Sequence, residues 1–239
     1  MTADLVVSTF RHEALATLFR VSTARLVDGN VVPGALRVLA WQRERDPYQG
    51  RWALPSGPVA DNETLGACVA RQLASKVDLR EIAHLEQLET RSDPARDPFE
   101  RTIATAYLGL VPSVAEPLLP ANAGWLDVSA LPSMAFDHAS IVTSAVQRLR
   151  RKLSYTNLGF ALAPPEFTMS QLRDVYAVAL GYEVSATNLQ RILERRGQLE
   201  PTGETASSTR AGGRPAQLFR FTRHEAEVTD QFAVLRPAH

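Results

Sequence analysis

Five residues around position 190 carry side chains that proteins use to read the edges of DNA bases. Asparagine pairs with adenine, arginine with guanine, and threonine contacts the thymine methyl group. Three of them follow an i, i+3, i+7 spacing, so a helix would present them on one face. Ordinary solvated surfaces also carry arginines at this spacing. The predicted neighbouring elements are therefore needed to distinguish a DNA-binding helix from a solvated one. The five candidates are Thr187, Asn188, Arg191, Arg195 and Arg196.

The surrounding pattern predicts two helices joined by a short turn. Thr168 as N-cap with Gln171 three residues later forms a capping box, and Gly181 can close this first helix. Ser185 can cap a second helix over residues 186–196. Two helices in this order predict a helix-turn-helix, whose second helix enters the major groove of DNA.

A hairpin with a long basic tip is predicted after the second helix. Alternation over residues 217–221 indicates a half-buried strand, and residues 199–221 together predict a β-hairpin. Its tip carries Arg210 and Arg214 among small residues, which suits contact with a phosphate backbone or a minor groove. The hairpin would form a wing, so both arginines join the candidate DNA contacts. A protein-interaction module is the alternative, and it would not bind duplex DNA with a steep salt dependence.

A second candidate site begins at Gly57. Glu63 follows after five residues and Arg71 after seven more. This spacing resembles the Nudix box, Gly-x5-Glu-x7-Arg-Glu-apolar-x-Glu-Glu-x-Gly-apolar, and Leu73 and Leu79 fill its apolar positions. The resemblance implies an α/β/α fold with a pocket for a nucleoside diphosphate compound. Hydrolases of that family cut a pyrophosphate with a Mg²⁺ or Mn²⁺ ion held by the glutamates.

The helix of the box departs from the pattern where catalysis depends on it. Gln72, Ser75 and Lys76 stand in place of three glutamates, and Asp78 stands in place of glycine. Mg²⁺ prefers carboxylate and phosphate oxygens. An ammonium repels a divalent ion by roughly 8 kcal/mol at about 4 Å and an effective dielectric constant near 20. We therefore predict no metal, no resident cofactor and no catalytic residue, and a pocket that binds its nucleotide without cutting it efficiently.

Six residues are the candidate contacts for this ligand. Arg71 and Lys76 can supply positive charge in place of a metal; alternatively Arg71 pairs with Glu63 and Lys76 is solvated. Trp52 can stack on an adenine or belong to the core, and Glu63 can be a remaining metal ligand or favour the helix dipole. The six are Arg51, Trp52, Gly57, Glu63, Arg71 and Lys76.

Two enzymatic alternatives remain open. In the first, the chain is a Nudix hydrolase with relocated ligands, and Glu86, Glu89 or Glu100 supplies the missing carboxylates. In the second, Asp137 and His138 form an acid–base pair. No nucleophile accompanies that pair, and a helix that begins at Asp137 already explains the acid.

Composition bounds the class of protein. The 239 residues, 45% hydrophobic and 22% charged, predict a soluble globular chain of one large or two ordinary domains. The single cysteine, Cys68, excludes an intramolecular disulfide and suits the reducing cytoplasm, and no apolar run could cross a membrane. The net charge is +0, yet residues 148–223 hold 12 basic and 6 acidic residues against 14 and 20 elsewhere. This asymmetry is consistent with an anionic partner for the basic part, and equally with a basic surface that is simply solvated.

The remaining pattern predicts a two-domain chain. Its predicted elements are strands at 35–41 and 101–111 and helices at 64–77 and 138–153. Composition changes after Lys152. We place a Nudix-like ligand-binding domain at residues 1–153, with the helix at 138–153 as linker, and a winged helix-turn-helix domain at residues 154–239.

Box, linker helix and winged domain in this order resemble the Nudix-related transcriptional regulators of NAD metabolism, the NrtR-like family. Short segments at 84–88, 93–98, 135–138, 167–172 and 213–221 add to the resemblance. It implies a homodimer that binds a palindromic operator in double-stranded DNA. It also implies repression of NAD biosynthesis or salvage genes, with an NAD-derived effector such as ADP-ribose. We expect the loop at 93–101 to contact either this ligand or the partner chain.

Overall fold

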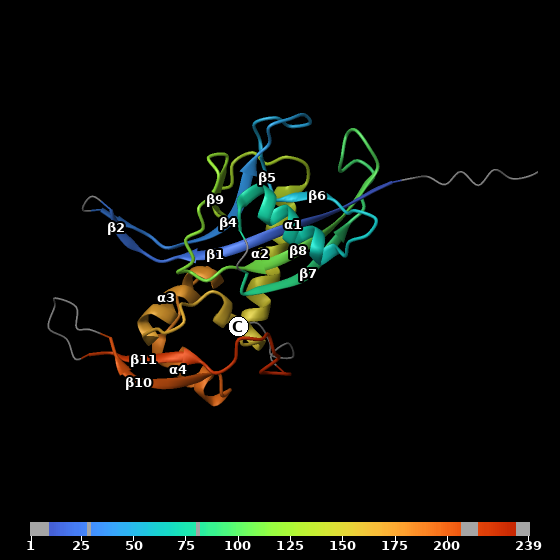
Figure 1. The fold of residues 1–239 in the computed structure, drawn as a ribbon. Coiled ribbons are helices and arrows are strands. Elements are labelled where there is room, and N and C mark those ends of the chain that lie inside the picture. Colours follow the sequence, from blue (N-terminus) through green and yellow to red (C-terminus); the bar gives the residue numbers. More distant parts are fainter. Residues whose placement is uncertain (1–9, 28–29, 80–81, 207–214, 233–239) are drawn as a thin grey trace, which may run out of the picture.

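The computed structural model describes residues 10–27, 30–79, 82–206 and 215–232. A mixed sheet with a helix on each face forms the larger part, and a smaller helical part with a β-hairpin lies beside it (Figure 1). The strands are β1 (Arg11–Ser22), β2 (Arg25–Val27), β3 (Asn30–Val32), β4 (Ala35–Gln42), β5 (Trp52–Ala53), β6 (Ser56–Pro58), β7 (His84–Arg91), β8 (Thr102–Leu110), β9 (Ala123–Asp127), β10 (Leu199–Thr205) and β11 (Gln217–Phe221). The helices are α1 (Leu65–Val77), α2 (His138–Tyr155), the 3₁₀ turn η1 (Leu158–Ala161), α3 (Met169–Leu180) and α4 (Ala186–Arg195).

Strand β1 is the centre of the sheet. The strand order is β5-β4-β1-β8-β7, with β6 also paired to β1 and β9 to β4. Strands β1 and β8 are parallel and the other pairs are antiparallel. A parallel pair inside a sheet must be covered on both faces, which explains why β1 is apolar on both sides.

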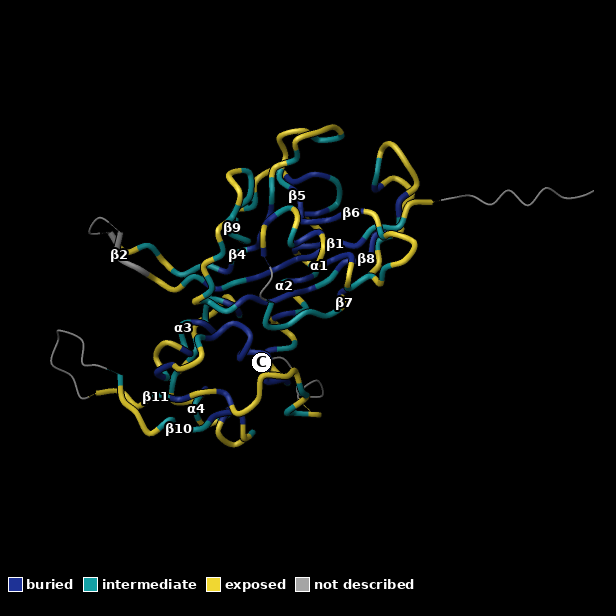
Figure 2. Tube along the Cα trace, in the orientation of Figure 1, coloured by how far each residue is buried: buried dark blue, intermediate teal, exposed yellow. Residues whose placement is uncertain are grey.

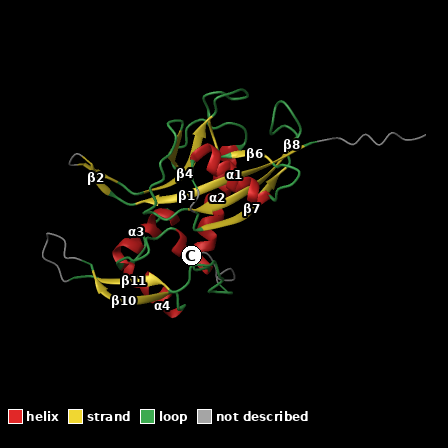
Figure 3. Cartoon of the chain, in the orientation of Figure 1, coloured by secondary structure: helices red, strands yellow, loops and turns green. Residues whose placement is uncertain are grey.

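Alternate residues of β1 supply two separate cores. Ala16 and Leu18 belong to the cluster that contains Val69 and Leu73 of α1. Phe19 and its alternating neighbours pack instead in the cluster that contains the apolar face of α2. The sheet and the inner helix faces are therefore largely buried, and most exposed residues lie in the connecting loops (Figure 2). Figure 3 shows these helices, strands and loops in the same orientation. This arrangement confirms the predicted α/β/α sandwich.

Helix α1 begins and ends where the box predicts. The Thr64 hydroxyl accepts a hydrogen bond from the Ala67 N–H at 3.2 Å and caps the helix. At the other end Asp78 adopts a left-handed conformation, with φ of 47°. Aspartate tolerates this region better than most residues, so it can replace the glycine of the box without loss of the helix end.

The smaller part follows the predicted helix-turn-helix. The Thr168–Gln171 capping box forms, Gly181 closes α3 with φ of 81°, and Ser185 caps α4. Strands β10 and β11 pair as the predicted hairpin. Its tip, with the candidate contacts Arg210 and Arg214, lies outside the described residues.

The two parts share one hydrophobic cluster. It runs from the α2 face of the sheet to Phe167, Leu172 and Tyr176 around α3, and on to Phe219 of β11. Helix α3 also contacts β1 and β4 directly. Within the described ranges, no helix combines the length and the apolar character that crossing a bilayer requires.

Candidate functional site

A cavity of about 300 Å³ opens where the box meets the first residues of β1 and the loop that precedes β8. Its wall contains three basic, three acidic and two aromatic side chains, together with the backbone around Gly57. Residues of the loop at 93–101 take part, so one of the two expectations for this loop, contact with a ligand pocket, is consistent with the structure. The charged and aromatic lining residues are Arg11, Arg43, Lys76, Glu13, Asp97, Glu100, Phe99 and Phe136.

Lys76 lies in this wall with its ammonium group held in place. Its Nζ donates a hydrogen bond to the Ser56 carbonyl oxygen and lies 4.6 Å from the centre of the Trp41 ring. Burial lowers the pKa of Lys76 to about 8, and the positive charges of Arg43 and Arg11 act in the same direction. These contacts argue against the interpretation that Lys76 is merely solvated, although its side chain is partly exposed.

Gln72 occupies the first of the three positions where the box has glutamate, and its side chain packs inside the protein. Its side chain is buried, and a Cβ atom on Gly57 would lie 2.1 Å from the end of its amide group, so any larger residue at position 57 would displace Gln72. Oriented to satisfy its neighbours, the amide donates to the Ser56 carbonyl oxygen at 3.0 Å and accepts from Arg71 Nη1 at 2.9 Å. An amide used in this way leaves no anionic oxygen for a metal.

The donor set does not fit the divalent cation that the Nudix fold implies. Ser75 is exposed, and its hydroxyl donates weakly to the Gln72 carbonyl oxygen at 3.4 Å. In the described part of the chain no three His, Cys, Asp or Glu side chains converge as a metal site. With an ammonium beside Ser56 in place of a carboxylate, no step of a reaction can be assigned to a metal at this position.

Glu63 and Arg71 bind each other. Arg71 Nε donates to Glu63 Oε2 at 3.0 Å, and its Nη2 donates to the Pro58 carbonyl oxygen at 3.0 Å. The hydrogen bond from Arg71, helped by the Ala60 N–H, lowers the pKa of the Glu63 carboxyl to about 2. The structural interpretation of Arg71, a partner for Glu63, is the one that the structure supports.

Only two of the six candidate ligand contacts, Gly57 and Lys76, line the cavity. Arg51 lies over the Tyr48 ring, 5.3 Å from its centre. Trp52 packs against the main hydrophobic cluster. The structure thus favours core packing over adenine stacking for Trp52, because its ring fills space beside the sheet rather than the cavity.

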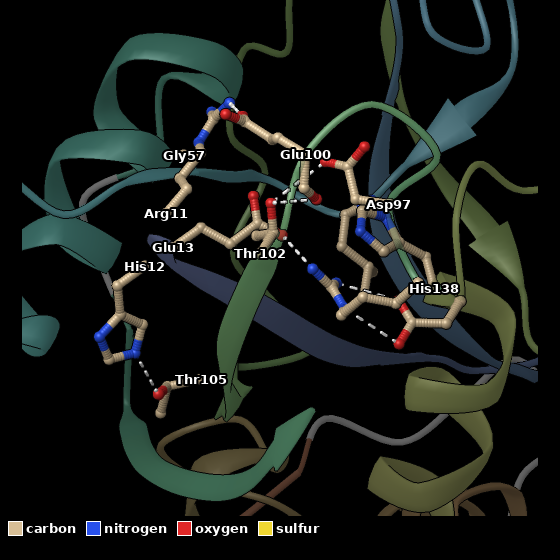
Figure 4. Close-up of polar contacts among 12 residues, drawn as sticks. Arg11, His12, Glu13, Gly57, Asp97, Glu100, Thr102, Thr105 and His138 are labelled. Carbon is tan, nitrogen blue, oxygen red and sulfur yellow. Dashed lines mark hydrogen bonds and ion pairs between the residues drawn. The ribbon is translucent and has the colours of Figure 1, made fainter. Parts of the chain in front are cut away.

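A buried arginine of the loop at 93–101, which is not among the candidate site residues, connects the cavity to α2. Arg96 Nη1 donates to Glu13 at 2.9 Å and Nη2 to Asp137 at 3.0 Å, and only 2% of its side chain is exposed. Glu13 is labelled in Figure 4, near Thr102 of the neighbouring strand. Glu13 lines the cavity and Asp137 occupies the N-cap position of α2, so one guanidinium joins them. Bidentate geometry and burial make such charge-assisted bonds strong.

The next residue, His138, is fully buried and neutral. Its Nδ1 accepts a hydrogen bond from the Leu54 N–H at 3.0 Å, and burial lowers its pKa to about 3. The Asp137–His138 acid–base pair does not form, because the Asp137 carboxylate binds Arg96. His138 instead packs beside Phe136, with ring centres 5.4 Å apart, behind the cavity wall.

Helix α4 presents most of the candidate DNA contacts to solvent. Thr187, Asn188, Arg191 and Arg195 are exposed, while the opposite face of the helix is buried. Arg191 Nη2 donates to Asn188 Oδ1 at 2.8 Å, so the two side chains form one polar surface.

Arg196 does not belong with this group. Its guanidinium donates to Asp230 at 2.8 Å and to the Ser154 carbonyl oxygen at 3.0 Å, with 10% of the side chain exposed. The inclusion of Arg196 among the base contacts is therefore not supported, since the turn at the end of α4 directs this side chain toward α2.

A Nudix sandwich joined to a winged helix-turn-helix is the architecture of a DNA-binding regulator that carries a nucleotide pocket. The model of the NrtR DNA-binding winged helix domain matches residues 159–221, and the model of the NUDIX domain matches residues 24–145. The chain is 31% identical over 217 residues to the ADPR responsive transcriptional repressor NtrR of Acinetobacter baylyi, across 88% of this chain and 85% of the relative. The chain belongs to the NrtR family of Nudix-related transcriptional regulators.

Two further comparisons complete this assignment. The crystal structure of Shewanella oneidensis NrtR complexed with a 27mer DNA is similar with a TM-score of 0.69 and 28% identity, over 88% of this chain and 93% of that one. The ADP-ribose pyrophosphatase of Methanocaldococcus jannaschii is 29% identical over 121 residues, which are 48% of this chain and 69% of the relative. The likeness to the regulators extends over both domains, whereas the likeness to this enzyme spans about half of the chain.

Proposed function

We propose that this protein is a transcriptional repressor of NAD biosynthesis or salvage genes that responds to ADP-ribose or another NAD-derived nucleotide. The observation that carries the proposal is the exposed Asn188–Arg191 surface on α4, within a winged domain of the NrtR family and on the same chain as the cavity. The relative in Acinetobacter baylyi is named as an ADPR responsive repressor, which supports this effector.

The proposed repressor acts as a homodimer on a palindromic operator. Two copies of α4 would enter successive major grooves about 34–36 Å apart, or a multiple of that spacing. Thr187, Asn188, Arg191 and Arg195 are the proposed base-reading residues, with Arg210 and Arg214 of the wing on the phosphate backbone. We place the boundary between the ligand-binding and DNA-binding domains at residues 153 and 154, in the last turn of α2.

Effector and operator are proposed to oppose each other through two arrangements of the dimer. A ligand shifts a population only by its differential affinity for the two arrangements. ADP-ribose must therefore weaken operator binding by the factor by which the operator weakens ADP-ribose binding.

Pyrophosphate hydrolysis is the second candidate function, favoured by the likeness to an ADP-ribose pyrophosphatase. The three carboxylates considered as relocated ligands argue against it. Glu86 pairs with Lys152 of α2, Glu89 accepts from Arg91 Nε at 2.9 Å, and Glu100 pairs with Arg11 at 2.6 Å. We propose that the chain binds its nucleotide without efficient turnover, because each of these acids is already engaged by a cation of the protein.

A gel shift tests the proposed function. The DNA lying upstream of the chain's own gene and of NAD biosynthesis genes is titrated with the protein, then with ADP-ribose, NAD and ATP. We expect a retarded complex whose affinity falls steeply with salt and changes with an NAD-derived nucleotide. A chain that retards no such DNA at low salt, or whose complex ignores all three nucleotides, would contradict the proposal.

A further inference from the structure

The most informative feature of the cavity is a pair of cations without carboxylate partners. Arg11 pairs with Glu100 and Glu13 binds Arg96, so these charges are largely neutralised within the protein. Lys76 and Arg43 also line the cavity, and in the described part of the chain neither forms an ion pair within 4.0 Å. The third acid of the wall, Asp97, accepts from the Phe99 N–H and the Thr102 hydroxyl and offsets only one of these two positive charges.

Both cations are held by backbone oxygens rather than by acids. Lys76 donates to the Ser56 carbonyl oxygen, and Arg43 Nε donates to the Pro47 carbonyl oxygen at 2.6 Å while its guanidinium lies over Phe136. An ammonium has three donors and a guanidinium five, so each group keeps donors beyond those used here. Burial lowers the pKa of both side chains, and the carboxylate of Glu13, which acts in the opposite direction on both, does not outweigh it.

The position of Lys76 decides what would neutralise this charge. It occupies the last glutamate position of the box, on the face of α1 that meets the Ser56–Gly57 backbone. A divalent cation here would be repelled by the ammonium and would lack carboxylate ligands. A partly buried charge without a partner is costly, whereas an anionic ligand would form charge-assisted hydrogen bonds with it.

We propose that Lys76, together with Arg43, takes the place of the divalent cation, so that this pocket binds the diphosphate of its effector directly and without metal. The inference rests on the proposed function for the identity of the effector. It goes beyond that function because it assigns the binding mode. In this pocket a lysine side chain, which is part of the protein, would replace a divalent cation that has to be bound from solution.

Calorimetric titration of the full-length protein tests whether Lys76 replaces the divalent cation. ADP-ribose and inorganic pyrophosphate are each titrated in EDTA and again in Mg²⁺. We expect the same affinity in both buffers. Replacing Lys76→Gln should weaken both ligands about ten- to hundredfold, the range for loss of a hydrogen bond to a charged group. Lys76→Arg should retain most of the affinity, since it keeps the charge.

Arg45→Gln is the matched control. Arg45 is exposed in the same loop as Arg43, and its replacement by glutamine also removes one positive charge. It should bind both ligands like the wild type. Operator binding in the gel shift shows that each variant is folded, and Arg43→Gln serves as the second test if Lys76→Gln loses its fold. Binding that needs Mg²⁺, or that is unchanged in Lys76→Gln, overturns the inference. Pyrophosphate that fails to bind in EDTA overturns it as well.

The two proposals fail separately. Pyrophosphate that binds in EDTA through Lys76, in a protein that ignores ADP-ribose, would uphold the built-in cation and contradict the proposed effector. ADP-ribose that binds only with Mg²⁺ would uphold the effector and remove the role of Lys76.

Discussion

The Arg196 guanidinium binds the Asp230 carboxylate at 2.8 Å and also donates to the Ser154 carbonyl oxygen at 3.0 Å. Arg196 ends the recognition helix α4, Ser154 lies in the last turn of α2, and Asp230 belongs to the segment after β11. At the opposite end of α2, Asp137 is bound to Arg96, which also holds Glu13 in the cavity wall. Helix α2 therefore connects the cavity to α4 through polar contacts at both of its ends.

Loss of the Arg196 contact should weaken the response to effector more than the binding of effector. The variant Arg196→Met removes the hydrogen bond to the Asp230 carboxylate and should lower the free energy of unfolding by about 1.5–3 kcal/mol, the range for a hydrogen bond to a charged group. ADP-ribose affinity should stay unchanged, because the cavity does not include Arg196. The ratio of operator affinities with and without ADP-ribose should move toward one.

The control for this variant is Arg223→Met. Arg223 pairs with Glu227 in the same C-terminal segment, but 69% of its side chain is exposed. An exposed pair contributes little, so stability should change by less than about 1 kcal/mol. An Arg196→Met protein that keeps the full effector response would show that this end of α2 does not transmit it. Urea unfolding and operator titration are the two measurements.

A direct base contact by Arg191 predicts a sequence-specific loss. The variant Arg191→Ala should weaken operator binding by about 1–3 kcal/mol, the range for one bidentate contact to a base. Binding to unrelated duplex DNA should fall less, because phosphate contacts supply most of that affinity. Fluorescence anisotropy on both duplexes measures the difference.

Arg45→Ala is the charge-matched control for Arg191→Ala, since Arg45 is exposed in the loop after β4 of the other domain. Equal losses on operator and unrelated DNA would assign Arg191 to the phosphate backbone instead.

Rebuilding the box should restore metal binding before it restores turnover. The wild-type chain should not hydrolyse ADP-ribose with Mg²⁺ or Mn²⁺, because Gln72, Ser75 and Lys76 provide no carboxylate. The triple variant Gln72→Glu, Ser75→Glu, Lys76→Glu returns three hard anionic ligands to α1. We expect it to bind Mn²⁺, detected as loss of the free-ion signal in electron paramagnetic resonance, while the wild type does not. Rapid cleavage of ADP-ribose by the wild type would contradict the proposed loss of catalysis.

Local signals explain what the sequence made predictable. The Thr168–Gln171 capping box and the positive φ of Gly181 depend on residues a few positions apart, and both are present in the structure as predicted. Helix α1 was predictable for the same reason, since its cap and its apolar stripe are continuous in sequence. These features fixed the order of elements and hence the fold class.

Long-range pairing explains what was not predictable. Strand β1 is buried on both faces, so it lacks the alternation that marks a half-buried strand, and it was not identified. The cavity wall combines residues from β1, the loop after β4, β6, α1 and the loop before β8. Arg96 and Asp137 are 41 residues apart, and no local pattern shows that their side chains meet. Of the six candidate ligand contacts, only Gly57 and Lys76 lie in this wall.

The neutral state of His138 predicts a stability that falls in mild acid. Its pKa is lowered from about 6.5 to about 3 in the folded protein, so the unfolded chain binds the proton more readily. Stability from this group is complete above the unfolded pKa and is lost as the pH falls from 6.5 toward 3. Between pH 7.5 and 5 the wild type should lose about 2 kcal/mol through His138.

The variant His138→Asn isolates this contribution, because an asparagine oxygen can still accept the Leu54 N–H but does not titrate. Its packing defect lowers stability at both pH values alike and cancels in the difference. Urea unfolding at pH 7.5 and pH 5 should therefore show a smaller loss for the variant by about 2 kcal/mol. If both proteins lose the same stability between pH 7.5 and pH 5, the folded protein must bind a proton at His138 as readily as the unfolded chain does. His138 would then not be the neutral acceptor of the Leu54 N–H.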